Sequence, residues 1–170
     1  MNHRTPSPDA FLERLGTHRK ILYKIANAYC RRDADRDDLV SEMVLALWRS
    51  YARYDDRYAF STWTYRVALN VAISFYRKRC RNEAFEAAWD DSLDRRPAEE
   101  RDEQLETLLA FVATLPPIDR ALVLAYLDGY THADIAGILG LSQTNVATKI
   151  SRLKERLRAT VQAAMERNVR

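Results

Sequence analysis

The sequence predicts an all-α protein of two small helical domains joined by an acidic linker, the C-terminal one containing a helix-turn-helix. Apolar residues recur at helical spacing over most of the chain, whereas no useful stretch alternates with the period of two that marks a β-strand. Between the two helical parts, residues 83–106 hold ten acidic residues against three arginines, a net charge of −7. We therefore expect domains at residues 1–84 and 105–170 and a linker at 85–104.

Composition narrows the class of protein. The chain has 170 residues, of which 47% are apolar, enough for a hydrophobic core in each part. Its longest apolar run, Ala121 to Leu127, is far shorter than the about 18 residues that a membrane span needs, and the N-terminus has no signal-peptide pattern. These features predict a soluble, cytoplasmic protein. Cys30 and Cys80 lack the spacing of a metal site, so we expect both to be small helix-packing residues.

Four helices are predicted in the first part. Ser7-Pro8-Asp9 is a helix-start signal with an N-cap, proline at the first helical position and an acid in the first turn. Gly16 is expected to end that helix, and Thr17 to cap the next one. The helices are expected at residues 10–15, 17–32, about 36–54, and 62–81 with Ser61 as the N-cap.

The last of these helices combines aromatic rings with positive charge. No Asp or Glu occurs from Arg57 to Asn82. At 100° per residue, apolar residues cover one broad face, and Trp63 falls in the middle of a polar and cationic stripe opposite. A ring among cations on the outer face favours stacking on a nucleic-acid base. The alternative is a core helix with a solvated basic edge. The stripe comprises Arg66, Asn70, Ser74, Arg77, Lys78 and Arg81.

The second part has clear signals for helix ends. Helical periodicity runs from Leu105 to Leu115, stops at Pro116-Pro117, and resumes until Gly129, which is expected just after a helix C-terminus. Thr131 and Asp134 have the capping-box spacing, with Asp in place of the preferred Glu.

A helix-turn-helix follows from this capping box. Gly140 supplies a turn residue, and Ser142 is expected to cap a helix from Gln143 to about Ala163. Val146, Ile150, Leu153 and Leu157 form the apolar stripe of that helix, and polar and basic residues lie opposite, as in a helix that reads a DNA major groove. The alternative is a structural helical hairpin with a solvated basic face. The polar face comprises Asn145, Thr148, Lys149, Arg152 and Arg156.

The sequence does not suggest an enzyme. His3, His18 and His132 are scattered, and the four glycines form no phosphate-binding loop. Neither a metal-ligand motif nor a nucleophile elbow is present, so we predict no catalytic residue, no metal and no cofactor.

The motifs together resemble a known family. DADRDDLVSEMVLALWRSY, FSTWTYRVALN, an acidic linker and LPPIDRALVLAYLDGYTHADIAGILGLSQTNVATKISRLKERLR occur in the order found in extracytoplasmic-function (ECF) sigma factors of bacterial RNA polymerase. The resemblance covers nearly the whole chain. It implies an initiation factor whose first domain binds the β′ clamp of core polymerase and the opened −10 element. The second domain would bind the β flap and the −35 duplex, and an anti-sigma factor is a further possible partner.

The resemblance also assigns roles to residues of the first domain. Asp38, Leu39 and Glu42 match the stretch that binds polymerase, although Ser41 stands where Gln is common. Trp63 falls where an aromatic stacks on a flipped −10 base. Arg66 and Val67 replace the tandem tryptophans of primary sigma factors, which implies weaker melting of imperfect promoters. The −10 contacts would be Trp63, Arg66, Asn70, Arg77, Lys78 and Arg81.

In the second domain, the resemblance places the −35 contacts on the second helix of the helix-turn-helix. Ala147 and Lys149 stand where Lys and Arg are frequent, so the −35 sequence may differ from that of better-known relatives. The contacts would be Gln143, Thr144, Asn145, Thr148, Lys149, Arg152 and Arg156.

Two other functions remain open from the sequence. A free-standing helix-turn-helix regulator would use the second domain and leave Trp63 and its cations unexplained. A sigma-mimicking protein that sequesters an anti-sigma factor would be expected to have weakened DNA-contacting faces, and here both faces are intact. Only a sigma factor requires tight, stoichiometric binding to core polymerase.

Overall fold

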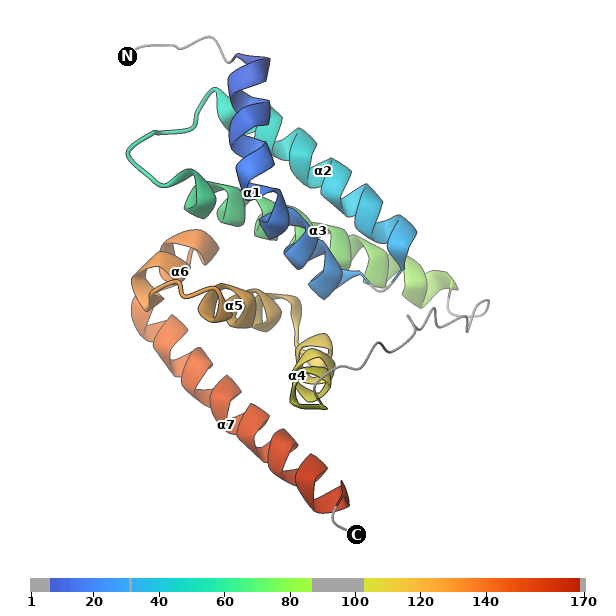
Figure 1. Ribbon diagram of the computed structural model, residues 1–170. Helices are drawn as coiled ribbons and strands as arrows, with labels where there is room; N and C mark the ends of the chain where they lie inside the picture. Colours follow the sequence, from blue (N-terminus) through green and yellow to red (C-terminus); the bar gives the residue numbers. More distant parts are fainter. Residues whose placement is uncertain (1–6, 31, 87–102, 169–170) are drawn as a thin grey trace. The chain divides into compact units, whose positions relative to one another are not determined.

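The computed structural model of the chain describes residues 7–30, 32–86 and 103–168. All regular secondary structure within these residues is α-helical, which confirms the predicted fold class (Figure 1). The chain divides into two compact units, Met1–Ser92 (unit 1) and Leu93–Arg170 (unit 2). The described helices are α1 (Pro8–Tyr29), α2 (Asp33–Tyr51), α3 (Phe60–Glu86), α4 (Glu103–Thr114), α5 (Pro117–Leu127), α6 (His132–Leu139) and α7 (Gln143–Asn168).

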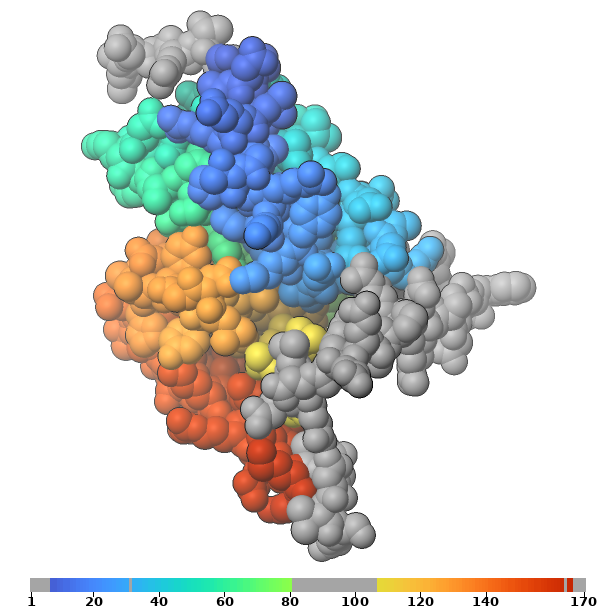
Figure 2. Space-filling view, in the orientation of Figure 1, coloured from blue at the N-terminus to red at the C-terminus, as the bar shows by residue number. Residues whose placement is uncertain are grey.

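Unit 1 is a three-helix assembly in which α1, α2 and α3 each pack against the other two. Figure 2 shows α1 lying directly beside α2 on one face of this unit. The apolar stripe of each helix supplies the core, and burying one such large side chain contributes about 1.5 to 3 kcal/mol. The largest fully buried side chains are Leu22, Ile25, Leu39, Met43, Leu47, Tyr65 and Leu69.

Helix α1 is continuous where the sequence predicts two helices. Ser7 caps it as expected, accepting a hydrogen bond from the Ala10 N–H at 3.5 Å. Gly16 does not end the helix, and the Thr17 hydroxyl donates to the Glu13 carbonyl one turn back instead of capping a new helix. An interior glycine costs about 1 kcal/mol relative to alanine. Burial of Leu15 before it and of Leu22 after it on the same core offsets that cost.

The starts of α2 and α3 also differ from expectation. Helix α2 begins at Asp33, three residues before the expected start at about 36. Carboxylates favour the positive end of the helix dipole in this first turn, and Asp33 pairs with Arg36. Helix α3 begins at Phe60, and the Trp63 N–H donates to the Ala59 carbonyl at 3.1 Å. Ser61 therefore lies inside the first turn of α3 and is not its N-cap.

The helices of unit 2 begin and end close to the residues that the sequence predicts. Pro116 and Pro117 separate α4 from α5. Helix α5 ends in a Schellman motif, in which the Tyr130 N–H donates to the Ala125 carbonyl at 3.2 Å. The Gly129 N–H donates to the Tyr126 carbonyl at 3.0 Å, and the φ of Gly129 is 81°, which glycine adopts without steric cost.

A buried arginine connects α4 and α5, which the sequence does not predict. Arg120 is only 4% exposed. Its Nη2 donates to the carbonyl oxygens of Ala113, at 2.8 Å, and Leu115, at 3.1 Å. A cation at the C-terminal end of α4 is stabilised by the helix dipole and satisfies carbonyls that the helix leaves without partners.

Other expectations concern the linker, membrane spans and cysteines. The predicted linker, 85–104, lies almost entirely outside the described residues. None of the described helices is both long enough and apolar enough to cross a membrane. Cys30 is buried, as expected for a helix-packing residue, but Cys80 is exposed, so that expectation is wrong for Cys80.

Candidate nucleic-acid interface

Helix α3 carries an exposed cationic stripe. Arg66, Asn70, Arg77 and Lys78 are all exposed, and within the described residues none of these three cations forms an ion pair. Arg79 behaves differently, because its guanidinium pairs with Asp35 of α2 and is 29% exposed. The helix thus has one structural arginine and several cations that face solvent. Arg81, also predicted here, has its backbone in α3, but its side chain lies outside the described part.

Trp63 lies at the end of this stripe and is half-buried. Its ring centroid is 5.0 Å from that of Tyr54, 5.2 Å from that of Phe60 and 6.3 Å from that of Tyr51. We call Tyr51, Tyr54, Phe60 and Trp63 the aromatic cluster. The expectation that Trp63 faces fully away from the packed side chains is therefore wrong, because Tyr51 at the end of α2 and Tyr54 just after it lie against the ring. Part of the indole remains accessible to a ligand.

The residues predicted to bind polymerase separate into two kinds. Asp38 and Glu42 are exposed, lie one turn apart on α2, and form no ion pair within the described part of the chain. Leu39 is 0% exposed, and its side chain packs in the core of unit 1 rather than on the surface beside Asp38 and Glu42. Ser41 is exposed, and its hydroxyl donates to the Asp37 carbonyl at 2.9 Å.

In unit 2, α6 and α7 form the predicted helix-turn-helix. The capping box is complete: the Asp134 N–H donates to Thr131 Oγ1, and the Thr131 N–H donates to Asp134 Oδ2, each at 3.1 Å. Hydrogen bonds from Thr131 lower the pKa of the Asp134 carboxyl. Gly140 has a φ of 67°, in the left-handed region. Ser142 Oγ then accepts from the Asn145 N–H at 3.2 Å, which fixes the start of α7.

One face of α7 packs on the other helices of unit 2. Val146, Ile150 and Leu153 are buried, as the stripe predicts, whereas Leu157 is half-buried. Ile138 of α6, which is not among the predicted core residues, is 2% exposed and belongs to the same core. The position i+3 from the buried Ile135 is the signal that could have identified it.

The opposite face of α7 is polar and accessible. The exposed side chains among the predicted −35 contacts are Gln143, Thr144, Asn145, Thr148, Arg152 and Arg156. Lys149 is 37% exposed, and its Nζ donates to Asp119 Oδ1 of α5 at 2.9 Å. It is therefore not the solvent-facing cation that helical spacing predicts. Arg156 also has a partner in unit 2, because its guanidinium carbon lies 5.8 Å from the centre of the Phe111 ring.

Comparison with known proteins matches both units to one family. Residues 15–82 match the Sigma-70 region 2 family, and residues 105–157 match Sigma-70, region 4. The chain is 29% identical to the ECF RNA polymerase sigma factor SigM of Mycobacterium tuberculosis over 152 residues, covering 87% of this chain and 75% of SigM. It is 28% identical to the RNA polymerase sigma factor CnrH of Cupriavidus metallidurans, covering 93% of this chain and 90% of CnrH.

Solved structures agree on the fold. The sigma factor RpoE of Bartonella quintana, solved in complex with the anti-sigma factor NepR, aligns with a TM-score of 0.74 at 20% identity, covering 90% of this chain and 97% of RpoE. CnrH in complex with the cytosolic domain of CnrY aligns with a TM-score of 0.67 at 23% identity, covering 94% of this chain and 92% of CnrH. With both sigma regions present in order, the chain belongs to the ECF sigma factors of bacterial RNA polymerase.

Proposed function

We propose that this sigma factor divides promoter recognition between its two units, with α3 of unit 1 at the opened −10 element and α7 of unit 2 at the −35 duplex. As a sigma factor, the chain directs core polymerase to promoters and assists initiation, and the polymerase performs the chemistry. The assignment of elements to promoter regions is the proposal.

The observation that carries the proposal is the combination of Trp63 with cations that have no ion-pair partner within the described residues. Arg66, Arg77 and Lys78 all face solvent on the helix that presents Trp63. Single-stranded nucleic acid is bound by this combination, because cations follow the phosphates while aromatic rings stack on the bases. Asn70 adds an amide that can donate to or accept from a base edge. Arg81 is included in the proposed −10 contacts on the sequence pattern alone.

Energetics are consistent with a role in melting. Stacking one base on an aromatic side chain is worth about 1 to 3 kcal/mol, and extracting a base from the duplex costs a few kcal/mol. A half-buried Trp63 offers one accessible part of its ring while its neighbours hold its orientation. Less entropy is then lost when a base stacks on it, because the ring is already ordered.

For the −35 element, we propose that the exposed face of α7 enters the major groove. The N-terminal residues Gln143, Thr144 and Asn145 would approach base edges, as the first turns of recognition helices do. Arg152 and Arg156, two and three turns further along, would bind phosphates or a guanine edge. Thr148 lies between these groups on the same exposed face.

For polymerase, we propose that Asp38 and Glu42 contact the β′ clamp, while unit 2 contacts the β flap. Both carboxylates are exposed and adjacent on α2, so they can meet basic residues without disturbing the core. Leu39 would act indirectly by anchoring this turn of α2 in the core.

We further propose that the protein is cytoplasmic and is regulated by an anti-sigma factor. Core polymerase and promoter DNA are cytoplasmic, so a sigma factor acts there. Regulation by an anti-sigma factor is proposed by analogy, because RpoE and CnrH were both solved with such partners or their cytosolic domains. Co-purification of the chain with a partner that blocks its binding to core polymerase would test this.

Charge removal on two different helices tests the −10 assignment. We would compare Arg77→Gln/Lys78→Gln on α3 with Arg19→Gln/Lys20→Gln on α1, which removes the same charge from exposed positions elsewhere in unit 1. The DNA would be a forked promoter fragment with a single-stranded −10 element, from a promoter mapped after overexpression. The α3 variant should weaken holoenzyme binding and lower the salt slope by about 0.7 for each phosphate that it no longer neutralises. Equal effects of the two variants would refute the assignment.

A further inference from the structure

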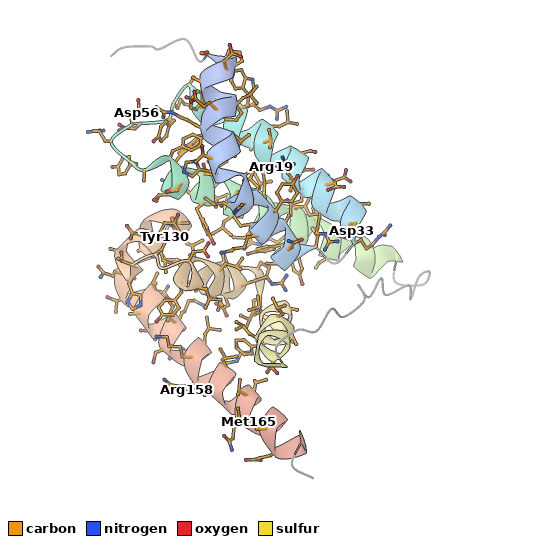
Figure 3. All side chains as sticks on the ribbon, in the orientation of Figure 1. Arg19, Asp33, Asp56, Tyr130, Arg158 and Met165 are labelled. Carbon is orange, nitrogen blue, oxygen red and sulfur yellow. The ribbon has the colours of Figure 1, made fainter. Side chains whose placement is uncertain are left out.

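An arginine of α1 reaches the segment that connects α2 to α3. Arg14 Nη1 donates to Asp56 Oδ1 at 2.9 Å (Figure 3, where Asp56 is labelled). The same guanidinium lies over two rings of the aromatic cluster, with its central carbon 5.7 Å from the centre of Tyr54 and 5.9 Å from that of Phe60. Arg14 thus connects three features: α1, the interhelical segment 52–59, and the rings that contact Trp63.

Tyr54 transmits this contact to Trp63. Its ring stacks on Tyr51 at 6.3 Å with an interplanar angle of 9°, meets Phe60 edge-on at 5.4 Å, and lies 5.0 Å from Trp63. Arg14 contacts the ring of Tyr54, and Trp63 is not among the rings it covers. A change at Arg14 therefore reaches Trp63 indirectly, through the neighbouring rings and segment 52–59.

Hydrogen bonds within segment 52–59 hold its local conformation. The Tyr54 hydroxyl donates to the Tyr58 carbonyl at 2.6 Å, and Arg57 donates from Nε to Asp55 Oδ2 at 2.8 Å. These bonds join residues at most four positions apart and shape the segment without attaching it to α1. Arg14 attaches the segment to α1, through Asp56 and the Tyr54 ring. The aromatic cluster itself also meets α1 at two other rings: His18 contacts Phe60 edge-on at 5.1 Å, and Phe11 lies 5.1 Å from Tyr51.

We propose that Arg14 is a positioning residue for promoter melting: with Asp56 it holds segment 52–59 and the aromatic cluster so that Trp63 presents a fixed ring to the unpaired −10 base. The proposal rests on the proposed role of Trp63. Arg14 itself does not contact the DNA.

The expected size of the effect follows from the two kinds of contact. An ion pair this exposed, with side chains 39% and 60% accessible, is weak alone. The guanidinium also contacts two rings, and cation–π contacts of this kind add a comparable amount. Removing both should lower open-complex formation about threefold to tenfold. Arg14→Lys keeps the charge but loses the planar group, so it should recover only part of the activity.

The test measures open complexes formed by reconstituted holoenzyme on a linear promoter fragment, by permanganate reactivity of −10 thymines. The variants are Arg14→Ala, Arg14→Lys, Trp63→Ala and the double variant Arg14→Ala/Trp63→Ala. Arg19→Ala is the matched control, because Arg19 is also on α1, contacts the Tyr23 ring at 5.1 Å, and forms no hydrogen bond or ring contact with segment 52–59 in the described residues. A second template, mismatched at −10, measures dependence on melting.

The proposal expects three results together. Arg14→Ala lowers opening of the duplex while Arg19→Ala does not, and the mismatched template recovers most of the loss. The double variant is no worse than Trp63→Ala, because a residue that acts through Trp63 has no effect once that ring is absent. A merely structural role predicts additive losses on both templates.

The failures are distinguishable. If Trp63→Ala lowers melting and Arg14→Ala does not, or if the two losses add, the role of Arg14 is refuted while that of Trp63 stands. If Trp63→Ala leaves melting unchanged, both proposals are refuted. Arg14→Lys separates a loss of melting activity from a loss of folding. It keeps the charge beside Asp56, so it should retain the thermal stability of the unsubstituted protein.

Discussion

Lys149 of the recognition helix and Asp119 of α5 form an ion pair, with Lys149 Nζ 2.9 Å from Asp119 Oδ1. Asp119 is 18% exposed and Lys149 37%, so the pair lies at the edge of unit 2 and not in its core. Asp119 competes with a DNA phosphate for the Lys149 ammonium and offsets its charge. The pair therefore stabilises the α5 to α7 packing while it reduces the contribution of Lys149 to DNA affinity.

Removing Asp119 should strengthen duplex binding. We expect Asp119→Asn to raise −35 affinity by about 0.2 to 1 kcal/mol, the usual energy of a partly exposed ion pair, and to steepen the salt slope by up to about 0.9 as Lys149 becomes able to bind a phosphate. Fluorescence anisotropy on a −35 duplex measures both. In a Lys149→Ala background, Asp119→Asn should leave the −35 affinity unchanged. A gain in affinity that remains in this background would show that Asp119 acts by repelling the DNA and not by holding Lys149.

Arg152 should contribute more to −35 binding than Lys149. It is exposed and has no ion-pair partner in the described structure, so Arg152→Ala should cost about 1 to 3 kcal/mol if the side chain makes a bidentate base contact. Lys154→Ala is the control on the same helix, because Lys154 Nζ is bonded to the Tyr126 hydroxyl at 2.6 Å. Equal losses from the two variants in a duplex titration would argue against docking of this face.

Charge reversal on α2 should separate polymerase binding from folding. Asp38→Lys/Glu42→Lys should weaken holoenzyme formation at least tenfold, about 1.4 kcal/mol, with little change in melting temperature, because both carboxylates are exposed. Glu13→Lys on α1 is the exposed control. Competition with another sigma factor for core polymerase measures the effect, and unchanged affinity of the double variant would remove this assignment.

The capping box should make unit 2 sensitive to acid. The folded pKa of Asp134 is lowered from 3.8, so its stabilising effect is complete above that value and is lost as the pH falls through the folded pKa. Asp134→Asn should lower the melting temperature by about 1 to 4 °C at pH 7, because it removes a charge at a helix start. The difference from the unsubstituted protein should shrink as the pH falls below 3.8 and through the lowered folded pKa of Asp134, and a difference that grows with acid would contradict the assignment.

Local rules predict the second unit better than the first. The Schellman motif at Gly129, the capping box at Thr131 and the cap at Ser142 each join groups within five residues, so spacing alone identifies them. The prediction fails at Gly16 because burial of the residues on either side of it outweighs the helix propensity of one glycine.

The exposure of two predicted site residues, Trp63 and Lys149, is also misjudged because it depends on residues that are distant in the sequence. Trp63 is half-buried because Tyr51 and Tyr54, nine residues or more before it, fold against the first turn of α3. The ion pair between Lys149 and Asp119 joins residues thirty positions apart on two different helices. The periodicity of a single helix cannot predict such a pair. Helical periodicity does predict that Arg66, Asn70 and Arg152 are exposed, because the exposure of each follows from its position on its own helix.

Directed cleavage of promoter DNA tests the division of the promoter between the two units most directly. Cys80 is an exposed thiol on α3, whereas Cys30 is buried, so an iron chelate that generates hydroxyl radicals can be attached beside the α3 stripe alone. A second protein, Cys80→Ser/Glu155→Cys, carries the chelate beside the exposed face of α7. In holoenzyme bound to a mapped promoter, we predict cleavage around the −10 element from Cys80 and around the −35 element from position 155. Cleavage in the reverse order, or at the same element from both positions, would contradict the account.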